Sequence, residues 1–208
     1  MAQIKSALEL ALERTKDLKV DQASLEANEL KQEGKRSAGR YLEEPATMDL
    51  KKKLDSYPKD KRAFVKIGMH DILSAQIQLP TNDSGLEKLG AIASAYAVIA
   101  GDGGMIGGVL AEKRVQGLFQ QLEAFLRKYL EDMRNVDQVI KQQWAPKLRE
   151  KERAMAARLG QEVRLDPMMD QEFSAFYKQN VGAVREQYQA ALDKAREDLA
   201  AMAGVAQD

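Results

Sequence analysis

Apolar residues recur every three or four positions through most of this chain, which is the pattern of helices with one buried face. Residues 4–20 show it clearly and predict an amphipathic helix of about four to five turns. The next stretch, 21–44, is polar and contains Gly34 and Gly39, so we expect a helix that is partly exposed or broken. Pro45 should end it, because the residue before a proline is displaced from the α region.

Two shorter helices are predicted next. One spans about 48–56, and the other spans 60–79 and should belong to the core. Ser84-Gly-Leu-Glu87 has the spacing of a capping box, so a further helix should begin at about Gly85. The core stripe expected in 60–79 consists of Phe64, Ile67, Gly68, Ile72, Ala75 and Leu79.

The strongest periodicity lies in the second half of the chain. Pro146 should kink or end a first long helix, and Asp166-Pro167 should supply the N-cap and first-turn proline of a last helix, whose stripe runs from Phe173 to Met202. The first long helix has the 3-4 spacing of an a/d seam at Phe119, Leu122, Leu126, Tyr129, Met133, Val136 and Ile140.

These elements predict an all-α fold. We expect an elongated helical bundle in which two long, coiled-coil-like helices pair antiparallel and shorter N-terminal helices cover their second face. The expected organisation is a single helical domain, 1–208. Its parts are the N-terminal helices (1–83), a core hairpin with the first long helix (84–145), a charged linker (146–165) and the last long helix (166–208).

Composition narrows the chemistry. The chain has no cysteine, which excludes disulfides, thiolate metal sites and cysteine nucleophiles. Lys plus Arg equals Asp plus Glu at 32 each, so no net charge directs the whole chain to nucleic acid or to an anionic membrane. The N-terminus reaches Glu9 before any apolar run of signal-peptide length, and a cytoplasmic location is therefore expected.

The stretch AIASAYAVIAGDGGMIGGVL, residues 91–110, contains one charge, Asp102. It lacks the lysine and hydroxyl residue of a phosphate-binding loop; its glycine amides could still bind an anion, although Asp102 would repel it. A membrane span would hold Asp102 near its centre at a cost of roughly 2.5–3.5 kcal/mol. We therefore predict a buried helix–turn–helix with Asp102 exposed at the turn. The small residues of this helix-packing hinge are Ala93, Ala97, Gly101, Gly103, Gly104, Gly107 and Gly108.

Two basic runs are candidate binding surfaces. The first has a local balance of +5 with Tyr57 and Phe64 interleaved, and the second has a balance of +4 with Trp144. Such surfaces could bind single-stranded or ribosomal RNA, although solvated helix faces are the ordinary interpretation. The first run consists of Lys51, Lys52, Lys53, Lys59, Lys61, Arg62 and Lys66; the second consists of Lys141, Lys147, Arg149, Lys151, Arg153, Arg158 and Arg164.

Catalytic signals are weak. His70 is the only histidine, so a triad would need carboxylates or serines as its other members, and a partly buried or surface histidine is the simpler interpretation. Carboxylate pairs such as Asp166 with Asp170 are expected on the surface. No cofactor and no metal is predicted.

Two stretches resemble known families. MAQIKSALELALERT with ELKQEGKRSAGRYLEEP, within the first 45 residues, resembles the start of small bacterial helical proteins of unknown function, which implies a bacterial cytoplasmic protein and no particular activity. AVIAGDGG is similar to the Ala-Asp-Gly turn of tellurite-resistance-type helical domains. Those domains place acidic residues after the glycine, where this chain has Met105-Ile106-Gly107, so no metal-binding residue is carried over.

Three functions follow in order. The leading prediction is a non-enzymatic cytoplasmic helical protein that binds a protein partner or forms a homo-oligomer, because the long stripes need partners and no catalytic constellation is evident. The alternative is an RNA- or ribosome-associated factor that uses the basic runs. The third is an enzyme with a carboxylate-based site near His70.

Overall fold

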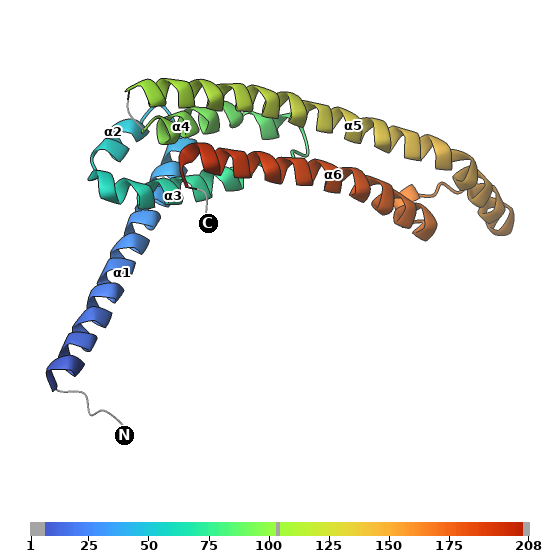
Figure 1. The fold of residues 1–208 in the computed structure, drawn as a ribbon. Helices are drawn as coiled ribbons and strands as arrows, with labels where there is room; N and C mark the ends of the chain where they lie inside the picture. Colours follow the sequence, from blue (N-terminus) through green and yellow to red (C-terminus); the bar gives the residue numbers. More distant parts are fainter. Residues whose placement is uncertain (1–6, 103–104, 206–208) are drawn as a thin grey trace. The chain divides into compact units, whose positions relative to one another are not determined.

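The computed structural model describes residues 7–102 and 105–205, and every regular element in these ranges is helical (Figure 1). This confirms the predicted all-α fold. Gly103 and Gly104 of the expected hinge lie outside the described residues, and Gly107 is described only in its backbone. The α-helices are α1 (Ala7–Glu43), α2 (Leu50–Asp55), α3 (Lys59–Gln76), α4 (Leu89–Gly101), α5 (Met105–Leu159) and α6 (Gln171–Ala203); η1 (Asp83–Leu86) and η2 (Pro167–Met169) are short 3-10 helices.

The chain divides into two compact units. Unit 1 consists of Met1–Ile77, Lys88–Gly117 and Arg196–Asp208, and unit 2 consists of Gln78–Glu87 and Leu118–Ala195. Unit 1 therefore contains α1 to α4, the first turns of α5 and the last turns of α6, whereas unit 2 contains the long paired stretches of α5 and α6.

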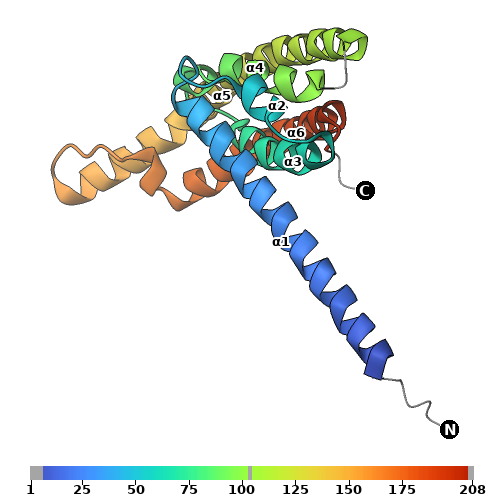
Figure 2. The ribbon, with the colours of Figure 1, turned by 90° about the vertical axis from the view of Figure 1, so that its left-hand side faces the viewer.

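Unit 1 is organised around the packing of α1 across α3 (Figure 2). A Cβ atom at Gly34 would lie 2.1 Å from the carbonyl oxygen of Val65, and one at Gly68 would lie 1.9 Å from that of Lys31. The two backbones can approach this closely only because both positions are glycine. Contrary to the expected division near residue 20, α1 is one continuous helix, and it is partly exposed as predicted, with Leu25 63% exposed.

Of the core stripe predicted for 60–79, only Gly68 is fully buried. Val65, Gly68, Met69 and Leu73 are buried, whereas Phe64 is 36% exposed. Both faces of this helix carry aliphatic residues, so periodicity did not distinguish them. The close glycine contact with α1 determines which face is inside.

The predicted capping box is also wrong. The Ser84 hydroxyl donates a hydrogen bond to the Asn82 side chain at 2.6 Å, and the N–H of Glu87 donates to the backbone carbonyl of Ser84 at 3.2 Å. These bonds close the 3-10 turn η1, and α4 begins only at Leu89. Short serine side chains compete in this way for local turns.

Unit 2 contains two long antiparallel helical stretches, as predicted. Tyr188 on α6 donates a hydrogen bond to Asp132 on α5 at 2.5 Å, and Tyr177, earlier on α6, donates to Asp137, later on α5, at 3.1 Å. Burial raises the pKa of Tyr188 to about 12, and the Asp132 carboxylate adds to the shift. Near the far end, the Trp144 ring meets Phe173 edge-on with centroids 5.8 Å apart.

Pro146 was expected to kink or end the first long helix, and it does not end it, because α5 continues to Leu159. Most of the expected charged linker, 146–165, is therefore helical. A proline inside a helix costs about 3 kcal/mol. Trp144 and Leu148 are both buried against the Phe173 cluster, and burying such side chains stabilises by about 1.5–3 kcal/mol each, which offsets the cost.

The N-cap of α6 is Asp170 and not Asp166. Asp170 accepts a hydrogen bond from the N–H of Phe173 at 3.0 Å, while Asp166 accepts from Met168 at 2.9 Å and caps η2. Asp170 is only 11% exposed, contrary to the surface position expected for it. The Lys151 ammonium, 2.5 Å away, holds the pKa of Asp170 below its ordinary value.

Candidate functional site

Unit 1 contains a hollow of about 980 Å³ between α2, α3, α4 and the first turns of α5, which we call the groove. Residues from both the first basic run and the predicted hinge line it. These features are separate in the sequence, and the fold brings them together.

The floor of the groove is made of small residues of α4. Ala93, Ala97 and Gly101 are spaced by four, so they lie along one side of the helix, and all of them line the groove. Because none extends beyond a Cβ atom, the space above α4 stays open. This corrects the expected tight packing at Ala97, which is half-buried at an open surface.

Close packing occurs only at the end of the floor. A Cβ atom at Gly108 would lie 2.7 Å from the carbonyl oxygen of Gly101, so the end of α4 and the beginning of α5 meet backbone to backbone. Both glycines were predicted as hinge residues. Only Gly108 needs to be glycine for this contact, because a Cβ atom at Gly101 would have no neighbour within 4 Å. Ala93, Ala97 and Gly101 form the floor.

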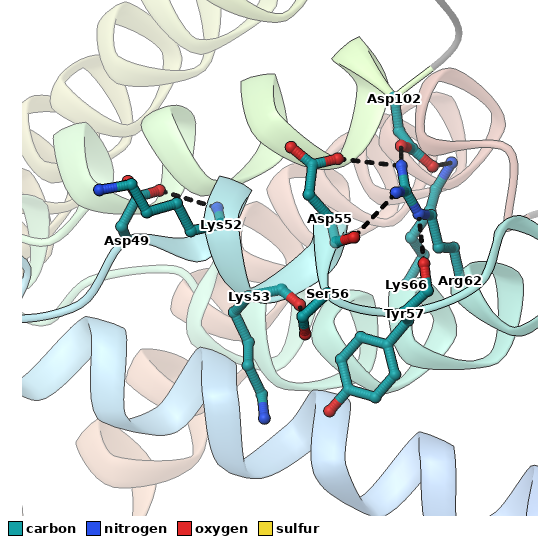
Figure 3. A network of polar contacts seen from close by, with 9 residues as sticks. All are labelled: Asp49, Lys52, Lys53, Asp55, Ser56, Tyr57, Arg62, Lys66 and Asp102. Carbon is teal, nitrogen blue, oxygen red and sulfur yellow. Dashed lines mark hydrogen bonds and ion pairs between the residues drawn. The ribbon is translucent and has the colours of Figure 1, made fainter.

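The environment of Asp102 differs from the predicted one. It was expected to be exposed at the turn, but its side chain is only 15% exposed. Arg62 Nη1 donates to Asp102 Oδ1 at 2.8 Å, and Lys66 Nζ lies 3.9 Å from Asp102 Oδ2 (Figure 3). These cationic partners offset the cost of burying most of the carboxylate.

Arg62 connects three segments of the groove wall. Besides Asp102, it contacts the Asp55 carboxylate at 3.0 Å, donates to the Asp55 carbonyl at 3.1 Å and donates from Nε to the Tyr57 carbonyl at 2.9 Å (Figure 3). The planar guanidinium has five N–H donors and suits this role. The end of α2, the body of α3 and the end of α4 are therefore held together at one side of the groove.

Most other residues of the first basic run already have acidic partners. Lys52 lies 3.6 Å from Asp49, whose carboxylate also caps α2, and Lys61 pairs with Glu26. Lys53 lies 3.1 Å from Glu33. The pKa of Lys53 is raised, first by its contact with Tyr57 and then by Glu33.

Lys51 and Lys59 are the exceptions. Both side chains are exposed, both line the groove, and among the residues that the structure describes neither has an acidic partner. Glu112 on α5 also lines the groove, and within the described ranges it has no basic partner. The groove therefore has uncompensated positive charge on the α2 and α3 side and one uncompensated negative charge on the α5 side.

The second basic run lies in unit 2 and forms no comparable site in the described part of that unit. Lys141 pairs with Asp137 at 2.8 Å, and the Lys147 ammonium lies 4.5 Å from the centre of the Trp144 ring. Lys151 bonds Asp170. The remaining members are exposed without an acidic partner among the described residues: Arg149, Arg153, Arg158 and Arg164.

His70 lies outside the lining of the groove. Its Nδ1 is 2.9 Å from the Tyr96 hydroxyl, and the two rings meet edge-on. Burial lowers the pKa of His70. Burial also raises the pKa of the Tyr96 hydroxyl strongly. Within 7–102 and 105–205, no group of three or more His, Cys, Asp or Glu side chains is arranged to hold a metal ion.

Sequence reasoning missed several groove residues. Asp55 and Glu112 were not singled out, and Asp102 was assigned to an exposed turn. Asp102 was visible as the only charge in an apolar stretch, but its partner Arg62 is 40 positions away. Among the described helices, none combines the length and the apolarity that a membrane crossing requires.

Fold and site together define an all-α protein with a groove that is floored by small residues and bordered by unpaired lysines. The chain belongs to a family of unknown function (DUF6657), whose family model matches residues 51–201. The matched region is thus the region of α2 to α6, and not the first 45 residues on which the sequence resemblance was based. No curated protein and no solved structure matches the chain.

Proposed function

We propose that this is a non-enzymatic cytoplasmic protein whose groove binds a helix of a partner protein. The observation that supports this most directly is the small-residue floor. From Ala93 to Gly101 it extends about 12 Å, or roughly two turns of helix, at 1.5 Å per residue. Large side chains of a docking helix could enter the space that these small residues leave open.

The edges of the groove support the same proposal. Val109, at the α5 side, is 54% exposed although it lies beside the apolar floor. Apolar surface next to a hollow and bordered by charges is typical of protein interaction sites. The ion pairs of Arg62 hold the wall in place before a partner arrives, which lowers the ordering cost of binding.

The nucleic-acid alternative has less support. In the first basic run most cations are already bound to carboxylates, so a phosphate would have to compete with Asp49, Glu33, Glu26 and Asp102. The groove itself is also lined by Asp55, Asp102 and Glu112. A phosphate backbone favours an uninterrupted basic surface.

Site-specific photocrosslinking in living cells tests the proposal. A benzophenone amino acid at Val109, which is 54% exposed and lines the groove from α5, should produce a discrete polypeptide adduct, and the same amino acid at Lys113, exposed on α5 and outside the groove lining, should not. The adduct should disappear when Ala93→Phe places a ring in the groove. Absence of an adduct at Val109, or an adduct that Ala93→Phe leaves intact, would refute the proposal.

A further inference from the structure

We infer that the helix bound in the groove presents aliphatic side chains to the α4 floor and carboxylates to Lys51 and Lys59. This inference rests on the proposed function and specifies the chemistry of the partner. Complementarity of charge and of side-chain size with the groove carries it.

Two acidic residues of the groove already have cationic partners. Asp55 and Asp102 are both engaged by Arg62, and Lys66 also lies near Asp102. Lys51, at the beginning of α2, and Lys59, at the beginning of α3, keep exposed ammonium groups without acidic partners among the described residues. Their flexible stems allow both ammonium groups to reach toward a bound helix.

Glu112 makes the preference one-sided. It lines the groove from α5, whereas Lys51 and Lys59 line it from α2 and α3, and within the described ranges no cation pairs with it. A carboxylate of the partner would be repelled on that side. The bound helix should therefore have acidic residues on one flank only, with neutral or basic residues on the other.

The α4 floor determines which side chains the partner helix presents between its two flanks. Ala93, Ala97 and Gly101 leave room for residues with long aliphatic side chains, such as leucine, at helical spacing. A partner helix with small residues at those positions would leave the groove empty. The expected partner thus has aliphatic residues at i, i+4 and i+7 and carboxylates beside them on one flank.

Two labelled helical peptides of defined sequence provide the probe. Both contain the same leucine stripe and glutamine on one flank; the other flank has glutamate in the first peptide and lysine in the second. Fluorescence anisotropy with the full chain at low salt should give a dissociation constant about tenfold lower for the glutamate peptide. The difference should shrink as salt screens the charges.

Charge reversal identifies the lysines responsible. Lys51→Glu with Lys59→Glu should invert the preference between the two peptides. The matched control, Lys113→Glu with Arg114→Glu, makes the same charge change at exposed positions of unit 1 that do not line the groove, and it should keep the preference. Because all four side chains are exposed, both double variants should retain the wild-type circular dichroism spectrum.

The outcomes separate this inference from the proposed function. Equal affinity for both peptides, tighter binding of the lysine peptide, or equal effects of the two double variants would overturn the acidic-helix inference. If neither peptide binds while the Val109 adduct persists in cells, the inference is wrong and the proposed function stands. A Val109 adduct that contains RNA in place of a polypeptide would overturn both.

Discussion

Gly34→Ala tests the contact on which unit 1 depends. The new Cβ atom would lie 2.1 Å from the Val65 carbonyl oxygen, about 1.3 Å inside the 3.4 Å at which ordinary contact begins. The obstructing atoms belong to the backbone of α3, so no side chain can turn away and α1 must move. We expect a loss of about 3 kcal/mol from this overpacking, reduced to about 2 kcal/mol by the better helix propensity of alanine.

The same helix offers a matched control. A Cβ atom at Gly39 would have no neighbour within 4 Å, so Gly39→Ala should stabilise α1 by up to about 1 kcal/mol. Urea unfolding followed by far-ultraviolet circular dichroism gives both free energies. If Gly34→Ala proves as stable as Gly39→Ala, the close packing of α1 on α3 is refuted.

Three further predictions concern the groove and unit 2. Ala97→Leu should leave the melting temperature nearly unchanged and abolish peptide binding, because its side chain enters the open groove; a large loss of stability would show that Ala97 is tightly packed. Arg62→Met should cost about 2–3 kcal/mol in urea unfolding because it removes the cation bonded to Asp102 and leaves only Lys66, 3.9 Å away, and adding Asp102→Asn should recover most of that loss; equal stability of the single and double variants would contradict this. Because the pKa of Asp170 is lowered in the folded state, its ionised carboxylate stabilises the fold at pH values above its ordinary pKa of 3.8. This contribution is lost as the pH falls from 3.8 toward the folded-state pKa. Asp170→Asn, which keeps a capping side chain, should therefore lower the melting temperature at neutral pH and lose this effect in acid; a constant difference at every pH would refute it.

The long helices could be predicted because their signal is local and redundant. Along α5 the apolar positions repeat over many turns, and Phe119, Leu122 and Leu126 are all buried as expected. A single exception such as Pro146 does not overcome that pattern. The antiparallel pairing follows because two long apolar faces in one chain need each other.

The face of α3 could not be predicted in the same way. Phe64 and Ile67 form one plausible stripe, and Val65, Met69 and Leu73 form another, so hydrophobicity alone does not choose between them. The choice is made by the contact of Gly34 with Val65, and this depends on residues 31 positions apart in the chain. Tertiary packing of this kind leaves no periodic trace in the sequence.

The composition of the groove was predictable only in part. The basic run and the small residues were both identified, but their meeting depends on the fold. The sequence also does not show which cations of the basic run remain unpaired, because the acids that neutralise the others come from distant positions. Glu26 is 35 residues from Lys61, and Asp102 is 40 residues from Arg62. Local charge counts therefore overstated the basic character of this surface.

The stretch 91–110 has two distinct physical roles, although its small residues were predicted to form a single hinge. Ala93 and Ala97 create space, because a small side chain on an open floor leaves a hollow. Gly108 does the opposite, because the absence of a Cβ atom there lets the backbone of α5 meet the Gly101 carbonyl oxygen. The ion pair between Asp102 and Arg62 ties the end of α4 to α3. The groove therefore keeps its width although the side chains of its floor are small. The single charge of this apolar stretch thus maintains the shape on which binding in the groove would depend.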